Sequence, residues 1–272
     1  MKALLRSDRG PVSDPDSRPS HRDGTAVVYV PGIDGTGNLL LGTQERLEGR
    51  FRLVCLRYEA EDSPDDRARD SYEALAGDIM RILDERGIDD AVLVAESFGG
   101  AVALTCALDH PSRVCAVAIV NSFAWYPKRA SLALGRVFAP LVTRSMFDWF
   151  RPRFAPWSLF GQPRDDEALR RFRAIEGGFF DRAYRRRLAM IRGLDLRPRL
   201  RELRMPVALF AATRDRVVPS MQCARTMQEH IPHATLEVVE GGGHLILPLS
   251  PLPWPEWIAA LAQSHPEDDT RA

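Results

Sequence analysis

The distribution of apolar and polar residues along the chain predicts short buried strands that alternate with helices. Short runs rich in apolar residues predict strands at 25–30, 51–58, 92–95, 114–120, 206–212 and 235–239. Uninterrupted apolar runs are typical of strands that are buried on both faces of a parallel sheet. Amphipathic or apolar segments between them predict helices at 39–47, 71–87, 101–108, 220–230 and 251–263. This alternation predicts an α/β fold with a doubly wound, mainly parallel sheet.

The alternation stops after Ser122, where an aromatic segment without strand patterns begins. Residues 123–184 carry 14 of the 22 aromatic residues, and several prolines divide the segment into short pieces. We therefore predict an inserted helical cap at 123–200, which separates the core into 25–122 and 201–272. The aromatic residues could form the interior of the cap alone. A short insertion has little interior, however, so we expect several of them, Trp125 and Phe180 in particular, to contact substrate.

Composition indicates a soluble globular protein and argues against nucleic-acid-binding, disulfide-rich and membrane-spanning proteins. The 272 residues are 45% hydrophobic and 27% charged, with a formal net charge of zero, which gives no argument for nucleic-acid binding. The four cysteines lack disulfide-framework or zinc spacing and suit small buried side chains in a reducing compartment. No apolar run approaches the length of a membrane span. We expect a cytoplasmic protein with a disordered tail at 1–24, and the sequence makes no prediction of the oligomeric state.

Positive charge is concentrated in the predicted cap. Residues 151–204 contain 15 arginines, no lysine and 7 acidic residues, and the run Arg185–Arg187 lies among them. Such a segment is usually a solvated outer face. A weak contact with an anionic membrane surface is an alternative. Nucleic acid is not expected as a partner, because no DNA- or RNA-binding motif accompanies the run.

One serine lies at a turn between a predicted strand and a predicted helix. The strand 92–95 leads directly into Glu96-Ser97-Phe98-Gly99-Gly100, and a helical segment follows. Small residues stand two positions before and after Ser97, where bulk would collide with the neighbouring strand or helix. This pattern matches the nucleophile elbow G-x-S-x-G, with alanine in place of the first glycine. Ser97 is therefore the candidate nucleophile.

Two more candidate catalytic residues follow later strands. Asp215 comes after the strand 206–212, and His244 follows the strand 235–239 through three glycines. The carboxyl ends of parallel strands lie at one edge of a sheet, so Ser97, Asp215 and His244 are expected there together. A serine hydroxyl needs a base, histidine has a suitable pKa, and a carboxylate orients the histidine.

A glycine-rich loop at 31–38 follows the first strand and lies at the same predicted edge. It has neither the G-x-G-x-x-G spacing nor the lysine of a nucleotide-binding loop. It could be only a tight turn, in which Asp34 stabilises the loop. The alternative that we favour is an oxyanion hole formed by the backbone N–H groups of Ile33 and Phe98. Glu96 could tune the histidine, although we expect a partly exposed elbow residue.

These motifs and their order resemble the α/β-hydrolase superfamily over about residues 25–263. The resemblance depends on P-G-I-D-G-T-G, A-E-S-F-G-G, R-D-R-V-V-P and G-G-G-H. More narrowly, the first two motifs resemble the hydrolase half of phytyl ester synthases and their bacterial relatives. Those proteins carry a further acyltransferase-type region with an H-x-x-x-x-D motif, which this chain lacks, so that activity is not implied.

The combined residues predict a serine hydrolase that cleaves carboxylic esters through an acyl-enzyme intermediate, without cofactor or metal. A small ester with an apolar acyl or alcohol group is the expected substrate. Serine at the elbow argues against haloalkane dehalogenase or epoxide hydrolase chemistry, which uses aspartate there. An acyltransferase that passes the acyl group to a lipid alcohol would use the same three residues. A non-catalytic receptor or scaffold is a third alternative, although such proteins usually lose one member of the triad.

Overall fold

The structure is a computed structural model of the chain, and it describes residues 24–58, 70–127, 146, 156–161, 165–175, 182–249 and 251–264. The predicted tail lies almost wholly outside these residues. No helix in the described part of the chain is long and apolar enough to span a membrane.

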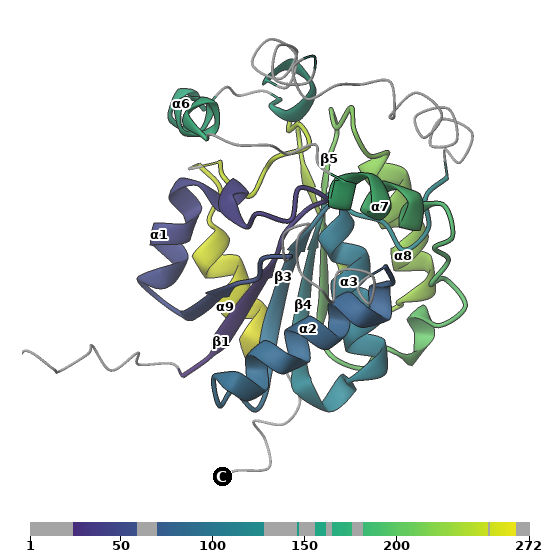
Figure 1. Cartoon of the computed structure of the whole chain (residues 1–272). Coiled ribbons are helices and arrows are strands. Elements are labelled where there is room, and N and C mark those ends of the chain that lie inside the picture. The colour runs from purple at the N-terminus through teal and green to yellow at the C-terminus, as the bar shows by residue number, and fades with distance from the viewer. Residues whose placement is uncertain are drawn as a thin grey trace, which may run out of the picture.

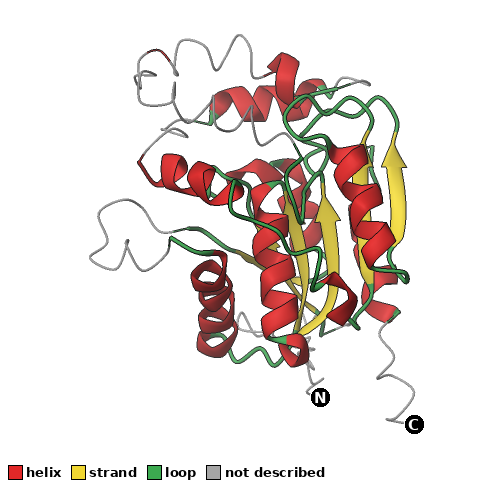
Figure 2. Ribbon diagram, turned by 90° about the vertical axis from the view of Figure 1, so that its right-hand side faces the viewer, coloured by secondary structure: helices red, strands yellow, loops and turns green. Residues whose placement is uncertain are grey.

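One parallel sheet forms the centre of the molecule, as predicted (Figures 1 and 2). The described residues form six strands, in the order β2-β1-β3-β4-β5-β6, and every neighbouring pair is parallel. The strands are β1 Ala26–Val30, β2 Arg52–Cys55, β3 Ala91–Glu96, β4 Val114–Val120, β5 Val207–Ala212 and β6 Thr235–Val239. The chain leaves β1 toward one edge and returns to β3 beside it, so β1 and β3 flank the topological switch point where α/β proteins bind ligands.

Helices cover both faces of the sheet, which confirms the doubly wound fold (Figure 1). One face packs against α2 (Tyr72–Glu85), α3 (Phe98–Asp109) and α8 (Ser220–His230). The other packs against α1 (Gly42–Glu48) and α9 (Trp254–Gln263). The chain also forms α6 (Asp166–Ala174), α7 (Arg182–Ile191) and short 3-10 helices at Asn38–Leu40, Pro111–Arg113 and Leu200–Glu202.

Several predicted elements differ in length from the observed ones, and two of the differences have a clear structural cause. The predicted strand 51–58 ends as β2 at Cys55, because the chain beyond it bonds to the glycine-rich loop: the N–H of Tyr58 donates to the Gly35 carbonyl at 2.9 Å. The predicted helix 39–47 is divided into the 3-10 helix Asn38–Leu40 and α1, because Leu41 between them has a φ of +49°.

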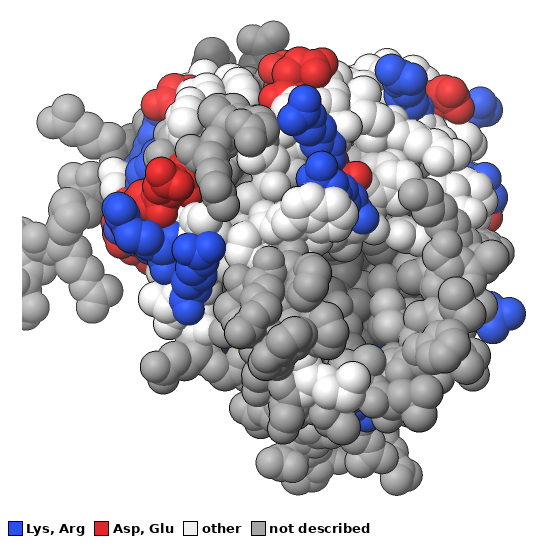
Figure 3. Space-filling view, turned by 90° about the horizontal axis from the view of Figure 1, so that it is seen from above, with Lys and Arg blue, Asp and Glu red and all other residues white. Residues whose placement is uncertain are grey.

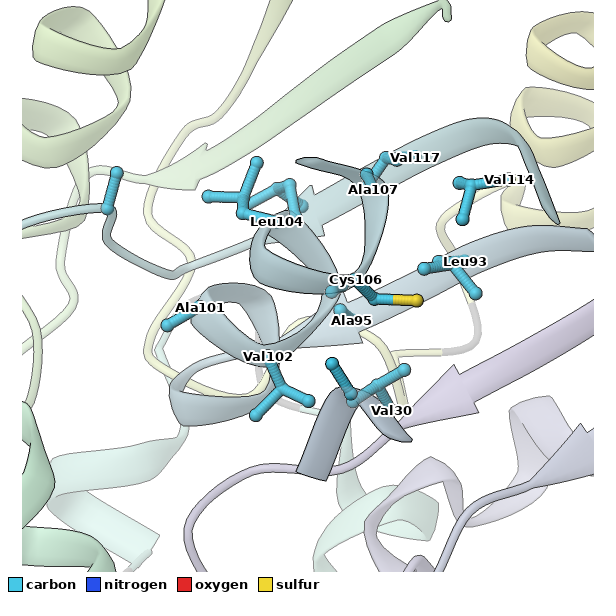
Figure 4. Packing of buried hydrophobic residues seen from close by; sticks show 14 of the residues in the cluster. Val30, Leu93, Ala95, Ala101, Val102, Leu104, Cys106, Ala107, Val114 and Val117 are labelled. Atoms are coloured by element: carbon cyan, nitrogen blue, oxygen red, sulfur yellow. The ribbon is translucent and has the colours of Figure 1, made fainter. Parts of the chain in front are cut away.

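Helix α3 is the central helix of the fold and is buried along almost its whole length. Its residues 98–108 are all buried, which fits a helix that is apolar on every side. Val102 points toward Val30 of β1, and Cys106 lies beside Ala95 and Leu93 of β3 (Figure 4). At the first turn the backbones almost touch, since a Cβ on Gly99 would lie 2.3 Å from the Pro31 carbonyl oxygen. Only glycine permits this approach.

The predicted cap enters the chain between β4 and β5, and its two ends are joined. Trp125 and Asp195 form an antiparallel bridge, and the Leu196 N–H donates to the Ala124 carbonyl at 2.9 Å. Phe123 packs in the main core and contacts the Tyr126 ring edge-on. The ends of the predicted insertion are therefore part of the core, and a separate, moving cap stays a prediction.

We expect Gly99→Ala to destabilise the fold, because its methyl group would overlap the carbonyl oxygens of Val30 and Pro31. The free energy of unfolding should fall by about 1–3 kcal/mol, as measured by urea denaturation. Gly77→Ala is the matched control, because a Cβ there meets nothing within 4 Å on the exposed side of α2. That variant should be as stable as the wild type or up to about 1 kcal/mol more stable. Equal stability of the two variants would contradict the close contact.

Candidate active site

Ser97 lies at a strained turn where β3 becomes α3. Its φ of 54° and ψ of −126° are rare for a residue with a side chain, and such strain is concentrated at functional sites. Neighbouring groups hold the conformation: the Ser97 N–H donates to the Val120 carbonyl at 2.9 Å, and Ser122 Oγ donates to the Ser97 carbonyl. The turn leaves no room for a side chain at Gly100, where a Cβ would lie 2.1 Å from Ser122 Oγ.

Asp215 and His244 meet at the carboxyl ends of β5 and β6. His244 Nδ1 and Asp215 Oδ2 are 2.8 Å apart, and both side chains are almost wholly buried. The other carboxylate oxygen accepts from the N–H groups of Val217 and Val218 at 2.8 and 2.9 Å. Ser220 Oγ donates to Asp215 Oδ2. The carboxylate therefore has one orientation, in which it faces the imidazole.

The loop that carries His244 is held from two sides. Asn121, at the end of β4, donates from Nδ2 to the carbonyls of Gly243 and His244 at 3.0 and 2.8 Å. On the other side, the Leu245 N–H donates to the Leu159 carbonyl at 2.9 Å. A Cβ on Gly243 would lie 2.5 Å from that same carbonyl oxygen, so the G-G-G-H sequence lets a second backbone segment pack directly against the histidine loop.

Ser97 and His244 line one cavity of about 280 Å³ at this edge of the sheet. The cavity is mostly apolar, and its volume is near the low end for small-molecule sites. Its other described lining residues come from the β1 loop and the 3-10 helix after it, the end of β3, the predicted cap and the chain after β5 and β6: Gly32, Ile33, Asp34, Leu39, Glu96, Ser158, Leu159, Phe172, Tyr184, Val217 and Leu245.

The two expected oxyanion-hole residues lie beside Ser97. Phe98 is the next residue, and Ile33 lines the same cavity. The β1 loop is close to the serine, because a Cβ on Gly32 would lie 3.6 Å from Ser97 Cβ. Within the described residues, neither the Ile33 N–H nor the Phe98 N–H donates a hydrogen bond. Both donors are thus available to a group bound at Ser97.

Electrostatic interactions favour the charged forms of both His244 and Asp215. Burial alone would lower the pKa of His244, but the adjacent Asp215 carboxylate and the charge of Glu96 outweigh it, so this pKa is raised. Burial alone would raise the pKa of Asp215, but His244, Ser220 and the Val218 N–H lower it. An imidazolium formed at His244 is therefore stabilised where a serine hydrolase needs it.

Glu96 is buried, contrary to the expectation of a partly exposed elbow residue. It is 2% exposed, because β3 continues to this position and its side chain lies on the same inward face as Val92 and Val94. Tyr29 Oη donates to Glu96 Oε1 at 2.5 Å, and Oε2 has no hydrogen-bond partner among the described residues. Burial, opposed by the Tyr29 hydrogen bond, raises the pKa of Glu96 to about 7.

Of the two aromatic residues expected to bind substrate, the structure describes only Trp125. Trp125 is not among the lining residues of the cavity; it lies under Arg197, whose guanidinium carbon is 4.2 Å from the ring centroid. Its expected role in substrate binding is therefore not supported by its position. Phe180 lies outside the described residues. Two other aromatic residues of the predicted cap, Phe172 and Tyr184, line the cavity, and substrate binding by the cap stays a prediction.

Many described arginines of the 151–204 segment are paired with acidic residues. Figure 3, which views the molecule from above, shows basic and acidic side chains beside one another on the side where α6 lies. Five arginine–acid pairs with N···O distances of 2.6 to 3.1 Å are Arg171–Glu45, Arg171–Glu167, Arg186–Asp70, Arg197–Asp195 and Arg199–Asp109. These pairs reduce the positive charge available to an anionic membrane, and that contact stays a prediction.

Curated relatives and solved structures of the same fold span most of the chain. Proteins named "Putative carbamate hydrolase RutD" from Caulobacter sp. (strain K31) and Cronobacter sakazakii are 26% and 27% identical to it. The alignments cover 82% and 84% of this chain and 84% and 87% of those proteins. Neither is a phytyl ester synthase, so that narrower resemblance stays a prediction.

Two crystal structures have a similar fold at low sequence identity. The enol-lactonase from Burkholderia xenovorans LB400 superposes with a TM-score of 0.74 at 17% identity, covering 90% of this chain and 93% of that one. The esterase RhEst1 from Rhodococcus sp. ECU1013 gives 0.71 at 19% identity, with 89% and 91% coverage. The model of the alpha/beta hydrolase fold family matches residues 25–251. Because this match spans most of the chain, the chain belongs to the alpha/beta hydrolase fold family.

Proposed function

We propose that the protein is a serine hydrolase that cleaves carboxylic esters with an apolar acyl or alcohol group. The observation that carries the proposal is the cavity shared by Ser97 and His244. Ser97, in a strained turn, and His244, hydrogen-bonded to the buried Asp215 carboxylate, both line this cavity. The rest of its lining is mostly apolar. Fold alone would not support an activity, but this arrangement of groups does.

The proposed reaction passes through an acyl-enzyme. Ser97 Oγ attacks the ester carbonyl carbon while His244 Nε2 accepts its proton, and Asp215 stabilises the imidazolium. The N–H groups of Ile33 and Phe98 bind the oxyanion of the tetrahedral intermediate. His244 returns the proton to the leaving alcohol, and the acyl group stays on Ser97. Water, activated by His244, then releases the acid and restores the serine.

The names of the relatives favour carbamate hydrolysis as a second candidate. A carbamate presents the same carbonyl to Ser97, with nitrogen on one side of the carbonyl carbon and oxygen on the other. Comparing kcat/KM for matched p-nitrophenyl esters and N-alkyl carbamates separates the two substrate classes. Acyl transfer to a lipid alcohol is distinguished by product analysis with that alcohol present. A non-catalytic scaffold would show no turnover that depends on Ser97.

The first test concerns the nucleophile. We expect Ser97→Ala to lower ester turnover by about 10⁴-fold or more while the protein stays folded. A fluorophosphonate probe should label the wild type at Ser97, as detected by peptide mass spectrometry. Because the residues act as a unit, Ser97→Ala combined with His244→Ala should be no slower than the slower single variant. Wild-type turnover in Ser97→Ala, or strictly additive losses, would refute the shared catalytic role.

The second test concerns pH. Hydrolysis requires neutral His244, so kcat/KM should fall as the pH drops through its raised pKa, above the ordinary value of about 6.5. Glu96 helps to raise that pKa, so Glu96→Gln should let the imidazole lose its proton at lower pH. The acid limb of the kcat/KM profile should then move to lower pH. Glu45→Gln, at an exposed ion pair on α1, is the control and should leave the limb in place. An acid limb that stays in place or moves to higher pH in Glu96→Gln would contradict the interaction between Glu96 and His244.

The third test concerns the apolar wall. Each buried methylene contributes about 0.8 kcal/mol, or about fourfold in binding, so kcat/KM should climb with acyl length until the cavity is full. Leu159→Ala enlarges the cavity and should move the acyl length with the highest kcat/KM to longer p-nitrophenyl esters within a C2–C16 series. Trp125→Ala, at a residue outside the cavity lining, should leave the optimum unchanged. A shift in the Trp125 variant alone would mean that substrate occupies a different site.

A further inference from the structure

Arg187 is buried, although the arginine run around it suggested a solvated outer face. It belongs to α7 and is only 6% exposed. Its guanidinium reaches the β1 loop, where Nε donates to the Ile33 carbonyl at 2.7 Å and Nη2 donates to the Asp34 carbonyl at 3.2 Å. A buried cation on the predicted cap thus binds the backbone of the loop that carries one oxyanion donor.

Tyr58 contacts both the Arg187 guanidinium and the same loop. The guanidinium carbon lies 5.3 Å from the centroid of the tyrosine ring. Tyr58 Oη donates to the Pro31 carbonyl at 3.0 Å, and its ring contacts the Phe98 ring edge-on, with centroids 6.1 Å apart. Gly35 is needed here, because a Cβ on it would lie 2.6 Å from the Tyr58 ring and 3.2 Å from the guanidinium carbon.

These contacts hold the peptide group that carries the Ile33 N–H. The Gly32 carbonyl, in that same peptide, accepts from the Gly35 N–H at 3.0 Å. Because a peptide is planar and trans, fixing this carbonyl directs the Ile33 N–H to the opposite side. The preceding carbonyl is held by Tyr58 and the following one by Arg187. Three successive carbonyls of the loop are therefore bound, and Arg187 is the contact that comes from the predicted cap.

The same helix also contributes to the cavity wall. Tyr184, one turn before Arg187 on α7, lines the cavity with Ser97. Residues three apart on a helix lie on neighbouring parts of its surface. The position of α7 therefore affects both the space for substrate and the loop with the Ile33 N–H.

We propose that Arg187 is a positioning residue that connects the predicted cap to the oxyanion hole. This inference depends on the proposed hydrolase function. Arg187 touches no reacting atom; it acts by holding the Ile33 carbonyl, and through it the orientation of the neighbouring N–H. Lysine is not equivalent, because a single ammonium group lacks the planar fork that binds two carbonyls and stacks on Tyr58.

The test compares Arg187→Met and Arg187→Lys with Arg186→Met as the matched control. Arg186 is the preceding residue on α7, but its Nε pairs with Asp70 at 3.1 Å. The measurements are kcat and KM for p-nitrophenyl butyrate and the Ki of a trifluoromethyl ketone, whose hydrate or hemiketal oxygen mimics the oxyanion. Thermal unfolding of each variant accompanies them.

We expect Arg187→Met to lower kcat by about 10- to 100-fold, less than the roughly 10²- to 10³-fold cost of losing an oxyanion donor outright, because the donor is misplaced and not removed. KM should change by less than about threefold, because the donor acts mainly in the transition state. The Ki of the ketone should rise in proportion to the loss in kcat/KM. Arg187→Lys should fall between the wild type and Arg187→Met, and Arg186→Met should stay within about twofold of the wild type.

The inference is overturned if Arg187→Met retains the kcat and Ki of Arg186→Met, or if its loss is confined to KM. If Arg187→Met does not fold, the folded Arg187→Lys variant decides by the same comparison. Failure of the underlying function is distinguishable, because it leaves the wild type and Ser97→Ala with the same turnover. In that case both proposals fall, whereas Ser97-dependent turnover with an unaffected Arg187 variant rejects only the role of Arg187.

Discussion

The direct backbone contact between the first turn of α3 and the end of β1 determines the geometry of the candidate site. At Gly99 no side chain separates the helix from the carbonyl oxygens of Val30 and Pro31. The helix can begin at the elbow only because of this contact, and the loop after β1 is thereby brought beside Ser97. The contact lies at the switch point between β1 and β3, where connections leave the sheet in opposite directions and a crevice opens. The candidate nucleophile, the proposed oxyanion loop and the cavity are therefore brought together by one close backbone contact.

Features that depend on local sequence could be predicted well. The strand–serine–helix pattern around Ser97 is local, because the small residues that the turn needs are close to it in the chain. Asp215 and His244 follow strands that are recognisable from their apolar runs, and parallel pairing brings strand ends to one edge. The prediction of β6 agrees with the structure residue for residue. Fold class and the Asp215–His244 contact were therefore accessible without coordinates.

Features that depend on long-range packing could not be predicted. The burial of Glu96 depends on how far β3 continues and on Tyr29 from a neighbouring strand. The burial of Arg187 depends on backbone carbonyls more than 150 positions earlier in the chain, for which the arginine run carries no signal. The position of Trp125 likewise depends on packing, because aromatic density indicates a segment but not which of its rings lines the cavity.

The paired ends of the predicted cap have a consequence for how this chain could diverge. The Ala124–Leu196 hydrogen bond and the Trp125–Asp195 bridge join the two ends of the segment. The segment is therefore a loop whose ends are fixed beside the sheet. The entropy of closing such a loop changes slowly with length, by about 0.6 kcal/mol for each doubling. Parts of the segment that pack neither on the core nor on the site loops can therefore be lengthened or shortened at small cost to β4 and β5. Leu159 and Arg187 are not such parts, because they hold the His244 loop and the β1 loop. Under the proposed function, substrate preference could change in those parts while the candidate catalytic edge of the sheet keeps its geometry.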